Sequence, residues 1–128
     1  MKRYKVYTKE KGLIATNDYN DFVGLTLHRE DGSAYTEYDY TNTVTFESYW
    51  VGNKQHRLDG PASITYINGA IVLVEYYINN LIHRADGPAY IEYDISGNIE
   101  TTGYYIENIQ YTKCDYDKEL MKRKVNLL

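Results

Sequence analysis

The sequence has little cysteine, little proline and no long apolar run. One cysteine, Cys114, occurs in 128 residues, which excludes an internal disulfide bond and a metal site made of several cysteines. Such usage is typical of a reducing compartment, so we expect a cytoplasmic protein. The most apolar stretch, residues 70–74, is far shorter than the roughly 18 residues of a membrane span, and the basic N-terminus lacks the apolar core of a signal peptide. We therefore expect no membrane partner.

An excess of positive charge and the common cofactor motifs are also missing. The chain carries 14 Lys and Arg against 18 Asp and Glu, a formal net charge of −4. A non-specific nucleic-acid binder normally shows a basic footprint, so this balance disfavours that class. No Walker loop, GxGxxG, GxSxG or HExxH motif occurs. The sequence predicts no cofactor.

Tyrosine is the residue in excess, with 16 Tyr against 2 Phe and 1 Trp. Tyrosine suits a pleated, half-buried surface, where its ring packs and its hydroxyl stays in water. A composition rich in tyrosine and poor in proline favours an antiparallel sheet with one or both faces near water.

The motif HRxDG occurs three times, in HREDGSA at 28–34, HRLDGPA at 56–62 and HRADGPA at 83–89. We interpret the chain as one domain, 1–128, with a degenerate N-terminal cap at 1–27, repeats at 28–55, 56–82 and 83–110, and a C-terminal helix cap at 111–128. Each repeat continues with a tyrosine, a polar turn, an aromatic pair and an asparagine. These positions are Tyr38, Tyr66 and Tyr93; Tyr49-Trp50, Tyr76-Tyr77 and Tyr104-Tyr105; and Asn53, Asn79 and Asn108.

The turn residues of each repeat predict one β-hairpin. Asp-Gly marks a turn before the first strand, and Asn68-Gly69 is a strong hairpin signal between the two strands of the second repeat. Thr112 with Asp115 resembles a helix-capping pair, and helix formers follow. We therefore predict an all-β fold, an elongated antiparallel meander of about seven or eight strands closed by a short C-terminal helix that covers the last strand edge.

The HRxDG motif has a catalytic and a structural interpretation. Histidine and aspartate are acid–base groups and metal ligands, but a catalytic site needs one copy in one pocket. Equivalent positions two strands apart lie ~9–10 Å from each other, too far for three histidines to share one metal ion at ~2 Å. We therefore expect a non-enzymatic protein without a metal site. The residues expected to form structural turns are His28, Asp31, Gly32, His56, Asp59, Gly60, His83, Asp86 and Gly87.

The tyrosines also suggest a binding face, because tyrosine covers area at low entropic cost. We expect a protein partner, bound through the Tyr-rich sheet face or through the acidic edge, and a homo-oligomer remains open because an isolated sheet must bury a face. The alternative is single-stranded nucleic acid or a nucleotide held by rows of tyrosine and arginine, which the acidic middle of the chain disfavours. The candidate binding residues are Arg29, Arg57, Arg84, Tyr38, Tyr49, Trp50, Tyr66, Tyr77, Tyr93 and Tyr105.

The stretches HRLDGPASITYINGAIVLVEYYINN and HRADGPAYIEYDISGNIETTGYYIEN resemble the tyrosine-rich, MORN-like HRxDGPA repeats of bacteriophage and large DNA virus proteins. The first repeat departs from that pattern, with Ser33 in place of proline. The resemblance covers about residues 28–120 and implies an elongated sheet, an interaction role and no catalytic residues. It also implies a phage-encoded inhibitor or adaptor that binds a host protein, such as a defence protein, in the host cytoplasm.

Overall fold

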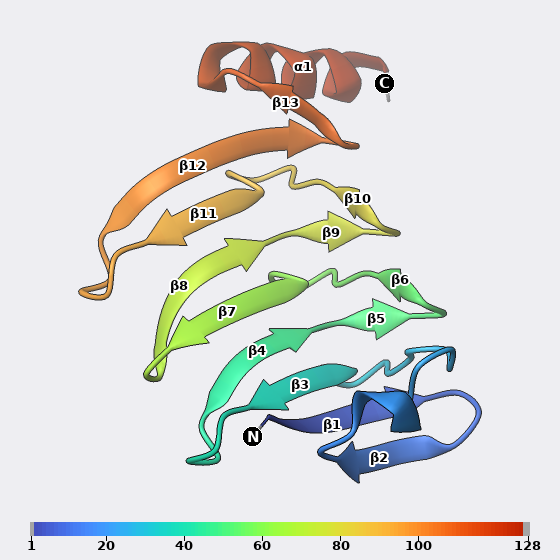
Figure 1. Cartoon of the computed structure of the whole chain (residues 1–128). Coiled ribbons are helices and arrows are strands. Elements are labelled where there is room, and N and C mark those ends of the chain that lie inside the picture. The colour runs from blue at the N-terminus through green and yellow to red at the C-terminus, as the bar shows by residue number, and fades with distance from the viewer. Residues whose placement is uncertain (1, 127–128) are drawn as a thin grey trace.

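The computed structural model describes residues 2–126 and shows one nine-stranded antiparallel sheet with a helix at one end (Figure 1). Neighbouring strands follow the order β13-β12-β11-β8-β7-β4-β3-β1-β2, and two short hairpins, β5-β6 and β9-β10, extend from it. The strands are β1 (Arg3–Thr8), β2 (Gly12–Thr16), β3 (Tyr35–Tyr38), β4 (Val44–Ser48), β5 (Trp50–Val51), β6 (Lys54–Gln55), β7 (Ser63–Ile67), β8 (Ala70–Glu75), β9 (Tyr77–Ile78), β10 (Leu81–Ile82), β11 (Tyr90–Tyr93), β12 (Ile99–Ile106) and β13 (Ile109–Tyr111). A 3₁₀ turn, η1 (Tyr19–Asp21), and a helix, α1 (Lys113–Asn126), complete the described chain.

The all-β fold with a C-terminal capping helix is confirmed, but the strand number differs from the expected seven or eight. Residues 2–126 contain 13 strands. In two of the three hairpins the second strand breaks at the first residue of its aromatic pair, Tyr49 or Tyr76, and the chain then makes a further short hairpin before it returns to the sheet. In the third, β12 continues through Tyr104 and Tyr105. The predicted caps extended to residue 1 and to residues 127–128, which lie outside the described residues.

The three long hairpins, β3-β4, β7-β8 and β11-β12, have two kinds of turn. Asn68 and Gly69 have φ angles of 49° and 82°, which a two-residue type I′ turn requires. In the other two hairpins an aspartate closes the turn instead, and the Asp94 carboxylate accepts the N–H groups of Ser96 and Asn98 at 2.9 Å each. All three hairpins carry a register shift at the same place, at Glu37/Tyr38, Thr65/Tyr66 and Glu92/Tyr93.

The short hairpins are tied to one another by asparagine. Asn80 has a φ of 69°, its N–H donates to the Gln55 carbonyl at 2.9 Å, and its Oδ1 accepts the Gln55 N–H at 2.8 Å. Asn53 makes the same pair of bonds to Leu27, and Asn108 to Ile82. The structural counterpart of Asn53 and Asn108 is therefore Asn80, rather than the Asn79 that the sequence spacing indicates.

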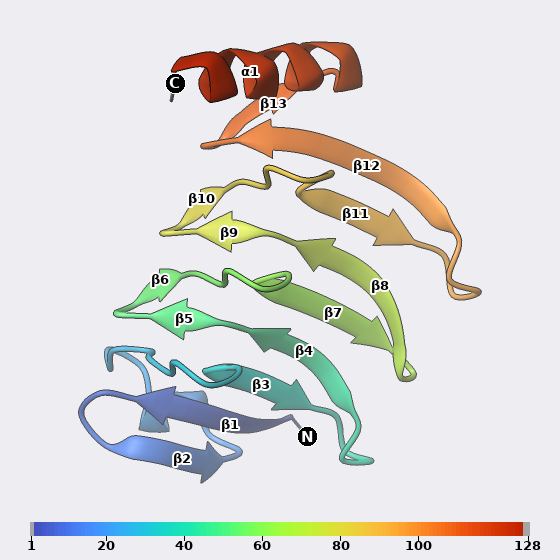
Figure 2. The same cartoon turned by 180° about the vertical axis from the view of Figure 1, so that it is seen from behind.

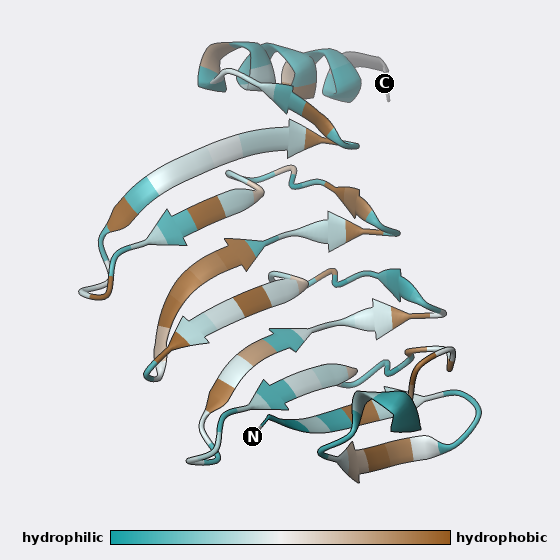
Figure 3. Ribbon diagram, viewed as in Figure 1, coloured by the Kyte–Doolittle hydropathy of each residue, from teal (hydrophilic) through white to brown (hydrophobic). Residues whose placement is uncertain are grey.

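The buried core is thin because the sheet is a single layer. Ile64, Val74 and Ile91 lie opposite one another on β7, β8 and β11, each 6–7% exposed, and Tyr66, Tyr76 and Tyr93 pack against them. Figure 3 shows this apolar character along β8. The HRxDG segments at 28–34, 56–62 and 83–89 are the connectors that lead into the next long hairpin. The alanines that end them, Ala34, Ala62 and Ala89, are fully buried.

The C-terminal helix lies against the last strands, as expected. The Thr112 hydroxyl accepts the Asp115 N–H at 3.1 Å, which is an N-cap. Tyr116 is buried, its ring centroid lies 4.9 Å from that of Tyr104, and its hydroxyl donates to the Arg84 carbonyl at 2.5 Å. Within residues 2–126, no helix is long and apolar enough to cross a membrane.

We predict that Asn80→Ala lowers the free energy of unfolding by about 1–2 kcal/mol, because it removes a hydrogen bond and places an alanine in the left-handed region. Asn80→Gly keeps the backbone conformation and should lose about 1 kcal/mol from the hydrogen bond alone. Urea denaturation of both variants measures the difference. Equal stability of Asn80→Ala and the parent chain would contradict the assignment of this bond.

Candidate functional site

Each HRxDG connector is organised around its arginine. Arg57 Nε donates to Asp59 Oδ1 at 3.0 Å, and Nη1 donates to the Pro61 carbonyl at 3.1 Å. The Arg57 guanidinium also stacks on the Tyr49 ring, with Cζ 4.0 Å from the centroid. The other connectors repeat these contacts, with Arg29 on Tyr7, Asp31 and Ser33, and Arg84 on Tyr76, Asp86 and Pro88.

The glycine of the motif makes room for this guanidinium. A Cβ atom at Gly60 would lie 2.9 Å from the Arg57 Cζ, and one at Gly32 would lie 2.7 Å from the Arg29 Cζ. Cβ atoms essentially never approach other atoms so closely, so a side chain at either position would require the guanidinium to shift on the tyrosine ring. Glycine therefore lets the arginine keep its stacked position at these two sites.

The histidine of each connector holds the turn of the next short hairpin. His56 Nδ1 accepts the Asn79 N–H at 3.1 Å, His28 Nδ1 accepts the Gly52 N–H at 2.9 Å, and His83 Nδ1 accepts the Glu107 N–H at 3.1 Å. A nitrogen that accepts carries no proton, so these bonds need the tautomer with hydrogen on Nε2. Within residues 2–126, no group of three or more His, Cys, Asp or Glu side chains is placed to hold a metal ion.

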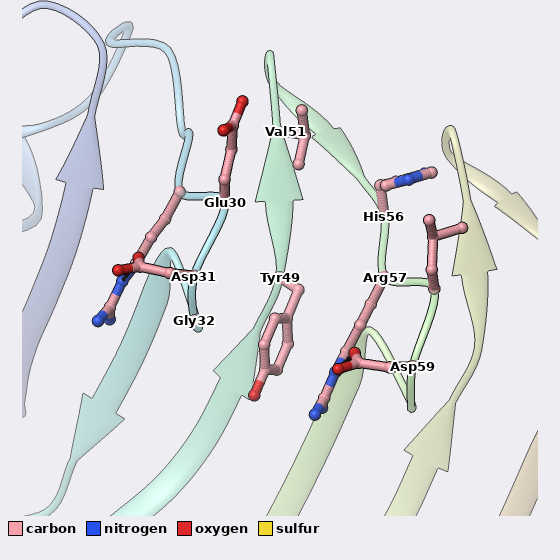
Figure 4. Close-up of a pocket in the computed structure, with 10 residues that line it drawn as sticks. Glu30, Asp31, Gly32, Tyr49, Val51, His56, Arg57 and Asp59 are labelled. Atoms are coloured by element: carbon pink, nitrogen blue, oxygen red, sulfur yellow. Dashed lines mark hydrogen bonds and ion pairs between the residues drawn. The ribbon is translucent and has the colours of Figure 1, made fainter.

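Two similar grooves lie between successive connectors. The first, shown in Figure 4, has a volume of about 640 Å³ and lies between the Arg29–Gly32 and His56–Asp59 segments, over Tyr49. The second has about 570 Å³ and lies between the connectors that contain Arg57 and Arg84. The arginine side chains are only 23–29% exposed, whereas those of their aspartate partners are 87–88% exposed. A ligand in these grooves meets carboxylates more readily than guanidinium groups.

The candidate tyrosines divide between the two faces of the sheet. Tyr66 and Tyr93 pack on the apolar cluster, and Tyr49 lies under Arg57, so these rings belong to the face that carries the connectors. Tyr38 is two residues from Thr36, which lies in register with Glu47 and Ile64 on that same face.

The second residue of each aromatic pair points to the opposite face. The Trp50 Nε1 donates to Ser48 Oγ at 2.7 Å, and the Tyr77 hydroxyl donates to Glu75 at 3.0 Å. A Cβ atom at Gly103 would lie 2.8 Å from the Tyr105 ring, so that ring also lies over the residue two positions before it. Adjacent strand residues face opposite sides, which separates rings that the sequence spacing grouped together.

Glutamates accompany the aromatic side chains on this second face. Tyr35 donates to Glu37 at 2.6 Å, and the Tyr90 hydroxyl donates to Glu92. Sequence reasoning missed these residues, although Tyr-x-Glu at 35–37 and 90–92 places both side chains on one side of a strand. We call this surface the aromatic–acidic face, and it comprises Tyr35, Glu37, Trp50, Glu75, Tyr77, Tyr90, Glu92 and Tyr105.

The hydroxyl groups of Tyr77 and Tyr90 on this face are held protonated. Burial and the Glu75 carboxylate raise the pKa of Tyr77 to about 12. The hydrogen bond to Glu92, together with burial, raises the pKa of Tyr90 to about 12. Each phenol therefore remains a donor to its carboxylate well above neutral pH.

An apolar groove lies at the N-terminal end of the aromatic–acidic face. Phe22 packs edge-on against Tyr35, with ring centroids 6.0 Å apart, and the groove beside them has a volume of about 360 Å³. Trp50, Leu27 and Gln55 are among its lining residues. The Gln55 Oε1 is buried and has no hydrogen-bond partner within residues 2–126.

Comparisons with protein-family models, with curated proteins and with solved structures found no match for this chain. The geometry of the connectors and of the aromatic–acidic face is therefore the basis for a functional proposal.

We predict that Gly60→Ala lowers the free energy of unfolding by about 1–3 kcal/mol, because its Cβ displaces the Arg57 guanidinium from Tyr49. In an Arg57→Ala background the same change should cost less than about 0.5 kcal/mol, since the obstructing group is gone. A double-mutant cycle by urea denaturation tests this coupling, and additive effects of the two changes would refute it.

Alkaline titration should reveal the pairing of Tyr77 with Glu75. A raised pKa in the folded state means that this phenol stabilises the fold fully below its ordinary pKa of about 10, and that the contribution is lost as the pH rises toward 12. Glu75→Gln removes the negative charge and should lower the pKa of Tyr77. Phenolate absorbance of the folded protein follows this shift, with Glu100→Gln as a control that should leave it unchanged.

Proposed function

We propose that this chain is a non-enzymatic protein-binding module built of hairpin repeats, and that it binds through the aromatic–acidic face. The observation that carries the proposal is the composition of that face, where half-buried aromatic rings alternate with tyrosine-bound glutamates. Aromatic side chains dominate the energetics of protein interfaces because they bury large areas with few rotatable bonds. The thin core supports it too, since a single-layer sheet leaves much of a face available.

The connectors support a structural role for the polar residues that could do chemistry. Arg57, His56 and Asp59 each make a contact that holds the connector or its neighbouring hairpin in place. The same contacts recur at every copy, whereas a catalytic centre needs one set of groups that differs from the rest.

The charge of the aromatic–acidic face favours a partner with exposed lysine and arginine side chains. Glu37, Glu75 and Glu92 place three carboxylates beside aromatic rings. A lysine or arginine of the partner can form an ion pair and a cation–π contact at one position. Complementary charge of this kind fixes orientation and speeds encounter.

We further propose that the partner is a host protein and that the chain is a phage-encoded inhibitor or adaptor. This part is supported by the resemblance of residues 28–120 to the HRxDGPA repeats of phage and large DNA virus proteins. The alternative ligand, single-stranded nucleic acid, needs guanidinium groups that are free to meet phosphates. In the three connectors these groups are stacked and bonded within the chain.

The test is capture of partners from a bacterial lysate by the immobilised chain, followed by mass spectrometry and by titration with the purified partner. The double variant Glu75→Gln and Glu92→Gln should weaken binding of that partner by about tenfold or more, because two carboxylates of the face are neutralised without loss of volume. The matched control, Glu30→Gln with Glu100→Gln, removes the same charge elsewhere and should bind as the parent chain does.

Two outcomes would count against this proposal. Equal affinity of the face variant and the control variant would remove the aromatic–acidic face as the binding surface. Salt-dependent binding of an oligothymidine that is lost in Arg57→Gln but kept in the face variant would support the nucleic-acid alternative.

A further inference from the structure

The two edge strands of the nine-stranded sheet, β13 and β2, have different surroundings. At one end, α1 lies along β13, and Arg123 joins the helix to Glu107 at 2.8 Å (Figure 2). At the other end, β2 is the last strand and pairs only with β1 in the sheet. An uncovered edge strand presents unpaired N–H and C=O groups that another strand can bind.

The hydrogen bonds of β1 show which groups of β2 face outward. Tyr7 donates its N–H to the Ala34 carbonyl at 2.8 Å, and its carbonyl accepts the His28 N–H at 3.0 Å, so its backbone points away from β2. Leu13 lies opposite Tyr7, and Ala15 lies two residues further along. Since backbone groups alternate along a strand, Leu13 and Ala15 direct their N–H and C=O groups to the open edge.

None of the usual features that protect an edge is present in β2. Its sequence, GLIAT, contains no charged residue and no proline, and its pairing with β1 shows no register shift. The Leu13 side chain is 50% exposed. Natural edge strands commonly carry lysine, proline or a bulge that prevents pairing with another chain.

We infer that β2 pairs with β2 of a second copy of this chain, antiparallel and around a two-fold axis at Ile14. In this register Leu13 lies opposite the partner's Ala15, and the two exchange N–H···O bonds on each side of the axis. Ile14 lies opposite the partner's Ile14 in the intervening pair, where side chains are closest. The two nine-stranded sheets then form one continuous sheet with a helix at each outer end.

The charged residues that flank β2 lie outside the paired residues of this arrangement. Lys11 immediately precedes the strand, and the register places it opposite the partner's Asn17. Asp18 is occupied on its own chain, where its carboxylate accepts the Asn20 N–H at 2.9 Å. Glu10 is occupied on its own chain, where its carboxylate accepts the Thr26 N–H and hydroxyl at 2.8 and 2.7 Å.

The first test is the mass of the full chain in solution by sedimentation equilibrium. The expected result is a mass twice the 15.0 kDa of one chain at micromolar concentration. Ala15→Pro removes one outward N–H without touching a bond to β1, and Leu13→Lys adds a charge to the edge, so each should weaken dimerisation by about tenfold or more. Ala15→Val keeps the N–H and should remain dimeric. Circular dichroism confirms that each variant folds.

The second test reports the register. Ile14→Cys in a Cys114→Ser background should form an intermolecular disulfide under mild oxidation, because the Cα atoms of a non-hydrogen-bonded pair lie about 4.5 Å apart. Leu13→Cys in the same background should cross-link at least about fivefold more slowly, since the partner's residue 13 is not opposite. A monomeric parent chain, a dimer that Ala15→Pro and Leu13→Lys leave intact, or equal cross-linking at both positions would overturn the inference.

Discussion

Stacking of an arginine guanidinium between a tyrosine ring and a glycine Cα is the contact on which the sheet depends. Arg57 lies on Tyr49, beneath Gly60, and its remaining donors bind Asp59 and the Pro61 carbonyl. A single-layer sheet cannot bury enough apolar surface to fix its connections by hydrophobic packing alone. Cation–π contacts and hydrogen bonds of the arginine fix each connector instead.

The same contacts determine which surface is left for a partner. On the connector face, each arginine stacks on a tyrosine and each histidine accepts a backbone N–H, so these side chains are occupied within the chain. On the opposite face, Trp50, Tyr77 and Tyr105 lie over residues of their own strands, and their outer surfaces remain available. Structural polar groups and interaction groups therefore lie on different sides of one sheet, although they alternate residue by residue in the sequence.

Local sequence signals were sufficient to predict the sheet, the turns and the helix, whereas the contacts between successive hairpins could not be predicted. Asn68-Gly69 and the Thr112 cap act through a few adjacent residues, so the sequence reveals them. The stacking of Arg57 on Tyr49 joins a connector to the preceding hairpin, and no spacing rule predicts it. For a similar reason the sequence spacing indicated Asn79 instead of Asn80 as the counterpart of Asn53 and Asn108. Only the hydrogen bond to Gln55 distinguishes the two asparagines. Strand alternation would have revealed the Tyr35–Glu37 pair.

The position of α1 has a consequence for the length of the protein. The helix contacts β12 and β13, and the Tyr116 hydroxyl donates to the Arg84 carbonyl in the last connector. The helix therefore contacts only the part of the sheet next to it. Each hairpin pair likewise contacts only its neighbours. Stability in such a structure is a sum of nearest-neighbour terms. Insertion of another copy of residues 56–82 would therefore elongate the molecule by one unit and leave both termini and every existing junction as they are.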